Sequence, residues 1–160
     1  MWLSPSFAES QAAGRACAEG NCEAVIASLE RSLRRQPGDF LIHYQLGLCY
    51  AGGCRAHALA NPDMAVPYLR RALLLMGTEA PARDRAAALG ALGNALAASQ
   101  AQPHGAALRA ALDCQRKAAR IYIAHEDETS MYYRFDIVSV IIPASGKPTT
   151  TIYRDAFRDE

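Results

Sequence analysis

The sequence changes character near residue 130, and this change most constrains the fold. Up to about residue 125 the chain is rich in alanine and predicts one helix after another. Residues 132–142 and 149–157 are instead rich in β-branched and aromatic residues, which is typical of strands. The connecting segment 144–148 predicts a β-hairpin. Because an isolated hairpin is marginally stable in water, this one must pack on the helices, pair with another chain or belong to a larger sheet.

The first predicted strand is apolar on both faces. Successive strand residues point to opposite faces. One face holds Tyr133, Phe135, Ile137 and Ile141, and the other holds Val138, Val140 and Ile142. A strand of this kind is covered on both sides. The preceding helix covers one face, so the second face and the open edge need the remaining helices or another molecule. We therefore expect a partner, and a homodimer through the C-terminal strand is one form of it.

Composition excludes several classes of protein. The chain of 160 residues is long enough for one core, and its net charge of +1 creates no overall field that attracts nucleic acid. Residues 1–5 lack the basic and apolar regions of a signal peptide, and no apolar run approaches the ~20 residues of a membrane span. We expect a cytoplasmic protein with no membrane contact. The odd number of cysteines predicts buried free thiols at Cys17, Cys22, Cys49, Cys54 and Cys114.

A helical repeat runs through the first two thirds of the chain. Small, bulky and helix-ending residues recur at fixed spacing at Val25, Leu29, Ser32, Pro37, Leu46, Gly47 and Tyr50. This spacing resembles the junction between two tetratricopeptide repeat (TPR) units, and the resemblance covers about residues 8–100. Its physical reason is close helix contact: Gly47 and Ser32 remove side chain where helices cross, and Pro37 ends a helix.

A second unit follows and a third is degenerate. Ala65, Leu69 and Ala72 repeat the pattern, although extra residues at 52–57 depart from the family. Asn61-Pro62 predicts a helix start and Gly77 a helix end. The third pair comprises 86–98 and a long helix at 104–125. The sequence thus predicts a mainly α fold, a TPR-like stack of antiparallel helix pairs with a C-terminal β-hairpin. Its two parts are the repeat region 1–103 and the tail 104–160.

The tail carries a second resemblance. Residues 115–124, the Arg-Phe-Asp strand 134–140 and residues 155–157 resemble, in this order, the C-terminal part of the YraN family, which has a restriction-endonuclease-like fold. The resemblance covers roughly the last 45 residues and implies a nuclease ancestry. Nucleases of this fold need acidic metal ligands and a Glu-x-Lys motif. Here Gln115 and Ser145 stand two residues before the only lysines, Lys117 and Lys147. We therefore predict that the chain is not an enzyme.

No other motif predicts catalysis or a cofactor. Cys49, Cys54 and His57 lack the spacing of a zinc site, so we interpret the cysteines as structural and expect no metal. The acidic run 126–128 is typical of a solvated loop. The nucleophile elbow, the phosphate-binding P-loop and the dinucleotide-binding glycine motif are all missing from the sequence.

Two functional hypotheses follow, and a third is that the chain has no selected activity. The first is a non-catalytic scaffold that binds a protein or peptide in a groove lined by His43, Tyr44, Gln45 and Tyr50. The second is a nucleic-acid-associated accessory protein. Its candidate phosphate contacts are Arg116, Lys117, Arg120 and Arg134. The balanced charge and the lack of interleaved aromatic residues favour the scaffold, since such a face is ordinarily solvated.

Overall fold

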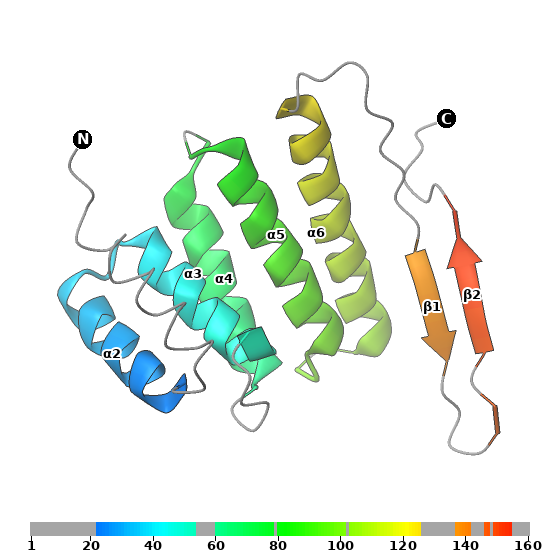
Figure 1. The fold of residues 1–160 in the computed structure, drawn as a ribbon, viewed down its shortest axis with the longest axis horizontal. Coiled ribbons are helices and arrows are strands. Elements are labelled where there is room, and N and C mark those ends of the chain that lie inside the picture. The colour runs from blue at the N-terminus through cyan, green and yellow to red at the C-terminus, as the bar shows by residue number, and fades with distance from the viewer. Residues whose placement is uncertain are drawn as a thin grey trace. The chain divides into compact units, whose positions relative to one another are not determined.

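A computed structural model describes residues 22–53, 60–78, 80–101, 103–125, 137–141, 146–147 and 149–154. The described chain is mainly helical (Figure 1). Its elements are α2 (Cys22–Arg35), α3 (Phe40–Leu48), the π-helical η1 (Cys49–Gly53), α4 (Pro62–Met76), α5 (Ala82–Ala98), α6 (His104–His125), β1 (Ile137–Ile141) and β2 (Thr149–Tyr153). The helices belong to one compact unit and the strands to another. Of the described helices, none combines the length and the apolar character needed to cross a bilayer.

Local signals in the sequence set the ends of the helices. Asn61 caps α4, because its Oδ1 accepts a hydrogen bond from the backbone N–H of Met64 at 3.2 Å. Pro62 follows as the first helical residue, and Gly77 ends the helix with a φ of 60°. These predicted boundaries are confirmed, as is the span 104–125 of the long helix. α2 ends at Arg35, two residues before the proline that was expected to stop it.

The five α-helices of the described residues form two rows. Each helix packs on the next one along the chain and runs in the opposite direction (Figure 1). Tyr68 of α4 packs against the apolar cluster that contains Leu29 of α2, and Leu73 of α4 packs in the same cluster as Cys114 of α6. α3 and α5 also touch. One row therefore contains α2, α4 and α6, the other contains α3 and α5, and helices within a row are parallel.

Close helix approach depends on two glycines. A Cβ atom added to Gly47 would lie 2.5 Å from Cγ of Leu69. The side chain of Leu69 on α4 therefore packs directly on the backbone of α3 at Gly47. This confirms the role predicted for Gly47. Gly93 does the same between α5 and α6, where an added Cβ would lie 2.8 Å from Nε2 of Gln115 and 3.1 Å from the carbonyl oxygen of Ala111. Small residues thus determine how tightly the two rows interlock.

The two strands pair with each other in antiparallel fashion. Ile137 lies opposite Tyr153 and Ile141 lies opposite Thr149. The rest of the predicted first strand, 132–136 and 142, falls outside the described residues, and so do the side chains of β1.

Asp63, in the first turn of α4, holds the connection between α5 and α6. Its Oδ1 accepts a hydrogen bond from the hydroxyl of Ser99, and further bonds from the backbone N–H groups of Gln100 at 3.0 Å and Ala101 at 3.2 Å. The pKa of Asp63 is lowered mainly by the hydrogen bond from Ser99. Burial raises the pKa in part, and the two backbone N–H donors lower it further. One carboxylate thus links positions 36 to 38 residues apart in sequence.

We expect Asp63→Asn to lower the melting temperature at neutral pH and to have less effect in acid. Because the folded-state pKa is lowered, the carboxylate contributes its full stability above the ordinary aspartate pKa near 3.8. That contribution is lost as the pH falls through the lower, folded-state value. Thermal unfolding followed by circular dichroism between pH 2.5 and 7 measures how the difference in melting temperature between Asp63→Asn and wild type decreases as the pH falls. Asp113→Asn, on the exposed surface of α6, is the control. A difference from wild type that is the same at every pH would contradict the assignment.

Candidate functional site

Aromatic side chains and one carboxylate gather where α2, α3, η1 and α4 meet. The rings of Tyr50 and Tyr68 stack, with centroids 5.7 Å apart and planes inclined by 4°. The His43 ring lies 6.1 Å from that of Tyr68, tilted by 42°. The hydroxyl of Tyr50 donates a hydrogen bond to Oε1 of Glu30 at 3.3 Å. We refer to these four residues as the aromatic–carboxylate cluster.

The backbone explains why these residues meet. His43 and Tyr50 are seven residues apart, so they lie on one side of the helix formed by α3 and its π-helical extension. The extension ends at a sharp turn, where Gly52 adopts a φ of 89° that favours glycine. The carbonyl of Tyr50 accepts a hydrogen bond from the backbone N–H of Asn61 at 2.8 Å, which ties the extension to the cap of α4.

His43 is the buried floor of the cluster. Only 8% of its surface is exposed, and its Nε2 donates a hydrogen bond to the carbonyl oxygen of Pro37 at 3.0 Å. Since a carbonyl oxygen only accepts, Nε2 is the donor of this bond. Nδ1 is buried with no hydrogen-bond partner among the described residues. His43 thus fills space between helices.

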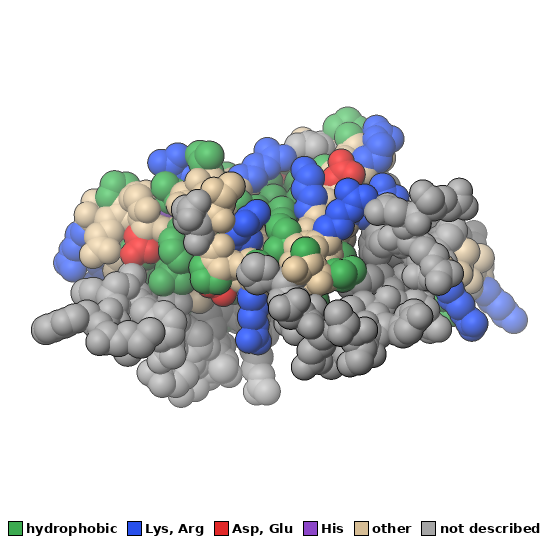
Figure 2. Space-filling model, turned by 90° about the horizontal axis from the view of Figure 1, so that it is seen from above, with side chains coloured by type: hydrophobic (Ala, Val, Ile, Leu, Met, Phe, Trp, Pro, Cys, Tyr) green, Lys and Arg blue, Asp and Glu red, His purple; other side chains and the backbone are tan. Residues whose placement is uncertain are grey.

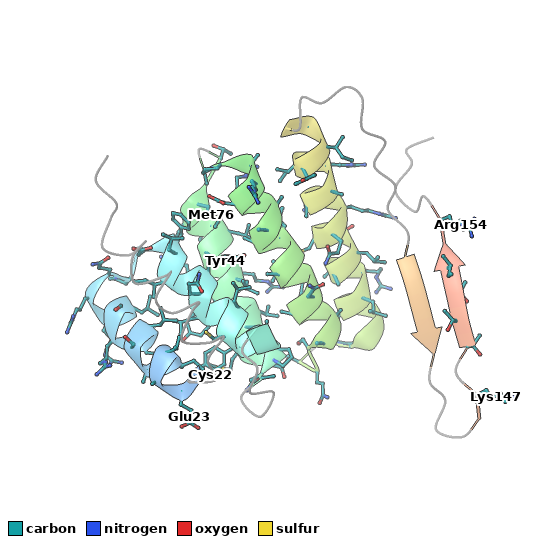
Figure 3. The ribbon with its side chains drawn as sticks, viewed as in Figure 1. Cys22, Glu23, Tyr44, Met76, Lys147 and Arg154 are labelled. Carbon is teal, nitrogen blue, oxygen red and sulfur yellow. The ribbon has the colours of Figure 1, made fainter. Side chains whose placement is uncertain are left out.

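The structure brings together two of the four residues predicted to line a groove. Tyr44 points away from His43, because consecutive helical residues are about 100° apart around the axis. Its side chain (labelled in Figure 3) packs with the second apolar cluster, which contains Leu92 and Leu96 of α5. Burial is the main cause that raises the pKa of Tyr44, and the charge of Asp84 raises it further. Gln45, the fourth residue, is half-buried.

The two stacked tyrosines share an electrostatic environment. Burial is the main cause that raises the pKa of Tyr50 and of Tyr68, and the negative charge of Glu30 raises both further. Both phenols therefore stay neutral at physiological pH. Half-buried aromatic rings beside a carboxylate form a surface that attracts a cation, through the ring faces and through the charge. Sequence reasoning missed Glu30 and Tyr68, which lie on other helices than His43 and Tyr50.

We expect Glu30→Gln to lower the pKa of Tyr50 and Tyr68, because it removes the negative charge that opposes phenolate formation. The shift should be partial, since burial of the rings is unchanged. Carbon-13 NMR of the tyrosine ring carbons as a function of pH resolves the individual phenols. Glu23→Gln, on the exposed surface of the same helix, should leave both pKa values unchanged. Equal titration curves for Glu30→Gln and wild type would contradict the contact.

The predicted phosphate contacts lie on the surface of α6. Arg116, Lys117 and Arg120 are exposed, whereas Arg134 falls outside the described residues. Lys117 does not act alone: burial raises the pKa of the Cys114 thiol, and the positive charges of Lys117 and of Arg70 oppose that rise. Arg70, on α4, therefore lies near the same thiol as Lys117.

The described thiols lie outside disulfide bonds. Cys22 and Cys49 are buried and Cys114 is half-buried. Cys17, Cys54 and His57 fall outside the described residues. Among the residues with described positions, no three His, Cys, Asp or Glu side chains gather closely enough to hold a metal ion.

Comparisons with protein-family models, with curated proteins and with solved structures found no match to this chain. The chemistry of the described residues is therefore the basis for a functional proposal.

Proposed function

We propose that the chain is a non-catalytic scaffold for protein–protein interaction, built from TPR-like helix pairs and extended by a hairpin tail related to the YraN family. Support for the repeat comes from the two interlocked rows of helices and from the small residues at their crossings, such as Gly47 and Ala65, which is fully buried. Rows of paired helices present extended surfaces to peptides and to other helices.

The aromatic–carboxylate cluster is the observation that carries this proposal. Tyr50 and Tyr68 are half-buried and stack beside Glu30, and the buried ring of His43 packs near that of Tyr68. Stacked tyrosines are rigid and lose little conformational entropy on binding, which suits them to anchor a partner. With a carboxylate at their edge they suit a lysine or arginine side chain. The partner is thus a peptide segment with an exposed basic residue.

Selection from a phage-displayed library of 16-residue peptides tests the proposal. Enriched peptides should carry lysine or arginine, and their affinity for the purified chain is then measured by fluorescence anisotropy. Tyr68→Ala should weaken binding by at least about tenfold, as loss of an aromatic anchor does. The matched control is Tyr122→Ala, an exposed tyrosine on α6 that should leave the affinity unchanged. Failure to enrich any peptide, or equal binding to Tyr68→Ala, would contradict the proposal.

We also propose that the tail strand is completed by a second copy of the chain. The support is the apolar sequence on both faces of residues 137–142, combined with a sheet of two strands among the described residues. Light scattering over a range of concentrations should give twice the chain mass of 17.3 kDa. A monomer at every concentration would mean that no such pairing occurs.

A further inference from the structure

Charge is unevenly distributed along a chain whose net charge is only +1. The described residues between 22 and 125 include eleven arginines or lysines but six aspartates or glutamates. Ten of the 16 acidic residues lie outside these described residues. The described helical surface is therefore basic, although the whole chain is nearly neutral.

Eight of the nine described basic residues of the row formed by α2, α4 and α6 lie in the C-terminal halves of their helices, and Arg109 is the exception. Because the three helices are parallel, these halves lie on the same side of the middle of the row (Figure 1). We call the following exposed residues there the basic stripe: Arg31, Arg34, Arg35, Arg70, Arg71, Arg116, Lys117 and Arg120. Viewed from above, lysine and arginine side chains recur across the described surface, while acidic ones are few (Figure 2).

Two of the four described acidic residues of the same row lie away from the stripe: Glu23 and Asp63 occupy the first turns of α2 and α4, where they suit the positive ends of the helix dipoles. Glu30 is engaged in the aromatic–carboxylate cluster. Asp113 lies on α6, one turn before Arg116 and Lys117. The C-terminal halves of the row therefore carry eight basic residues beside one acidic residue of the cluster and one neighbouring aspartate.

Basic residues of the stripe come from neighbouring helices of the row. Leu73 of α4 and Cys114 of α6 pack in the same apolar cluster, so Arg70 and Lys117 lie on adjacent helices of the row. Packed helices are about 10 Å apart, so a row of three helices extends the stripe over a distance on the order of 20 Å. A run of positive charge with this length matches a polymer of phosphates better than it matches a single small anion.

We propose that the basic stripe binds the phosphate backbone of a nucleic-acid duplex without reading its sequence. All but one of its residues are arginines, whose planar guanidinium groups bind phosphate oxygens in pairs. Its exposed apolar neighbours are Leu74 on α4 and Leu112 and Ile123 on α6, which lie on different helices. The stripe contains no aromatic residue on which single-stranded bases would stack. This surface and partner differ from those of the proposed scaffold function.

Fluorescence anisotropy with a labelled 24-base-pair DNA duplex and the full chain tests the proposal. With four phosphate contacts, affinity should fall about 150-fold between 50 and 200 mM salt. The double variant Arg70→Glu/Lys117→Glu should weaken binding at least tenfold at 50 mM salt and flatten the salt dependence. Arg109→Glu is the matched control: it makes the same kind of charge change in the N-terminal half of α6, outside the stripe, and should weaken binding less than threefold.

Several results would overturn the proposal. One is that the wild-type chain does not bind the duplex at 50 mM salt. Another is that Arg109→Glu lowers the affinity as much as the double variant does. Competition by poly-L-glutamate as strong as that by unlabelled duplex at equal charge would instead assign the stripe to an acidic protein. If circular dichroism shows that the double glutamate variant is unfolded, Arg70→Gln/Lys117→Gln replaces it, because this variant removes the same positive charges without adding negative ones. Tyr68→Ala should bind duplex normally, so that failure of the scaffold function and failure of this one are distinguishable.

Discussion

Replacing Leu69 with alanine should lower the free energy of unfolding by about 2–5 kcal/mol, the range for a fully buried leucine. Its side chain has no exposed surface, and it packs in the cluster that joins α4 to α5 and α6. Loss of the side chain removes apolar burial and leaves a cavity. Urea unfolding followed by circular dichroism measures the change. Leu74→Ala, on the same helix but 68% exposed, is the matched control and should change the stability by about 0.5 kcal/mol or less.

The contact between Leu69 and Gly47 can be tested by a double-mutant cycle. Gly47→Ala in the wild-type chain should cost about 1–3 kcal/mol, because the new methyl group overlaps the Leu69 side chain. In the Leu69→Ala background that obstacle is gone, so the same change should cost less. The two substitutions should therefore be coupled by about 0.5–3 kcal/mol in a double-mutant cycle. Strict additivity would show that the cavity and the glycine act independently, and would contradict the packing described for α3 and α4.

Local features of the fold follow from the sequence, since short-range chemistry determines them. Asn61-Pro62 and Gly77 mark the ends of α4 whatever surrounds it. The need for a small residue at Gly47 also follows, because a helix crossing needs one at a fixed spacing from its bulky neighbours.

Features that join distant positions do not follow from the sequence. Tyr50 meets Glu30 across 20 residues, and Asp63 meets Ser99 across 36 residues. Helix geometry alone separates Tyr44 from His43, but the direction each faces depends on where α4 and α5 pack. The sequence identified Arg116, Lys117 and Arg120 as candidate phosphate contacts but did not join them to the arginines of α2 and α4, because that grouping depends on the parallel course of α2, α4 and α6.

The second large effect is expected where α6 packs on α5. Gly93→Ala should lower the free energy of unfolding by about 1–3 kcal/mol, since the added methyl group would press on the carbonyl of Ala111 and on Gln115. Gln115 has little room to yield, because its Nε2 donates hydrogen bonds to the carbonyl of Gly90 at 3.2 Å and to Oδ1 of Asn94 at 3.0 Å. Movement of the side chain would break both bonds, and movement of the Ala111 carbonyl would shift α6 itself.

Gly90→Ala is the matched control, one turn earlier on the same helix. The nearest atom to an added Cβ there is Oε1 of Gln115 at 4.0 Å, an ordinary contact. Alanine is favoured over glycine within a helix by about 1 kcal/mol, so this variant should be as stable as wild type or more stable. If Gly93→Ala lowers the stability and Gly90→Ala does not, the cause is the α5–α6 contact and not helix propensity, since both substitutions lie in the same helix. If Gly93→Ala is also stabilising, α6 does not approach α5 as closely as the contact between Gly93 and Ala111 indicates.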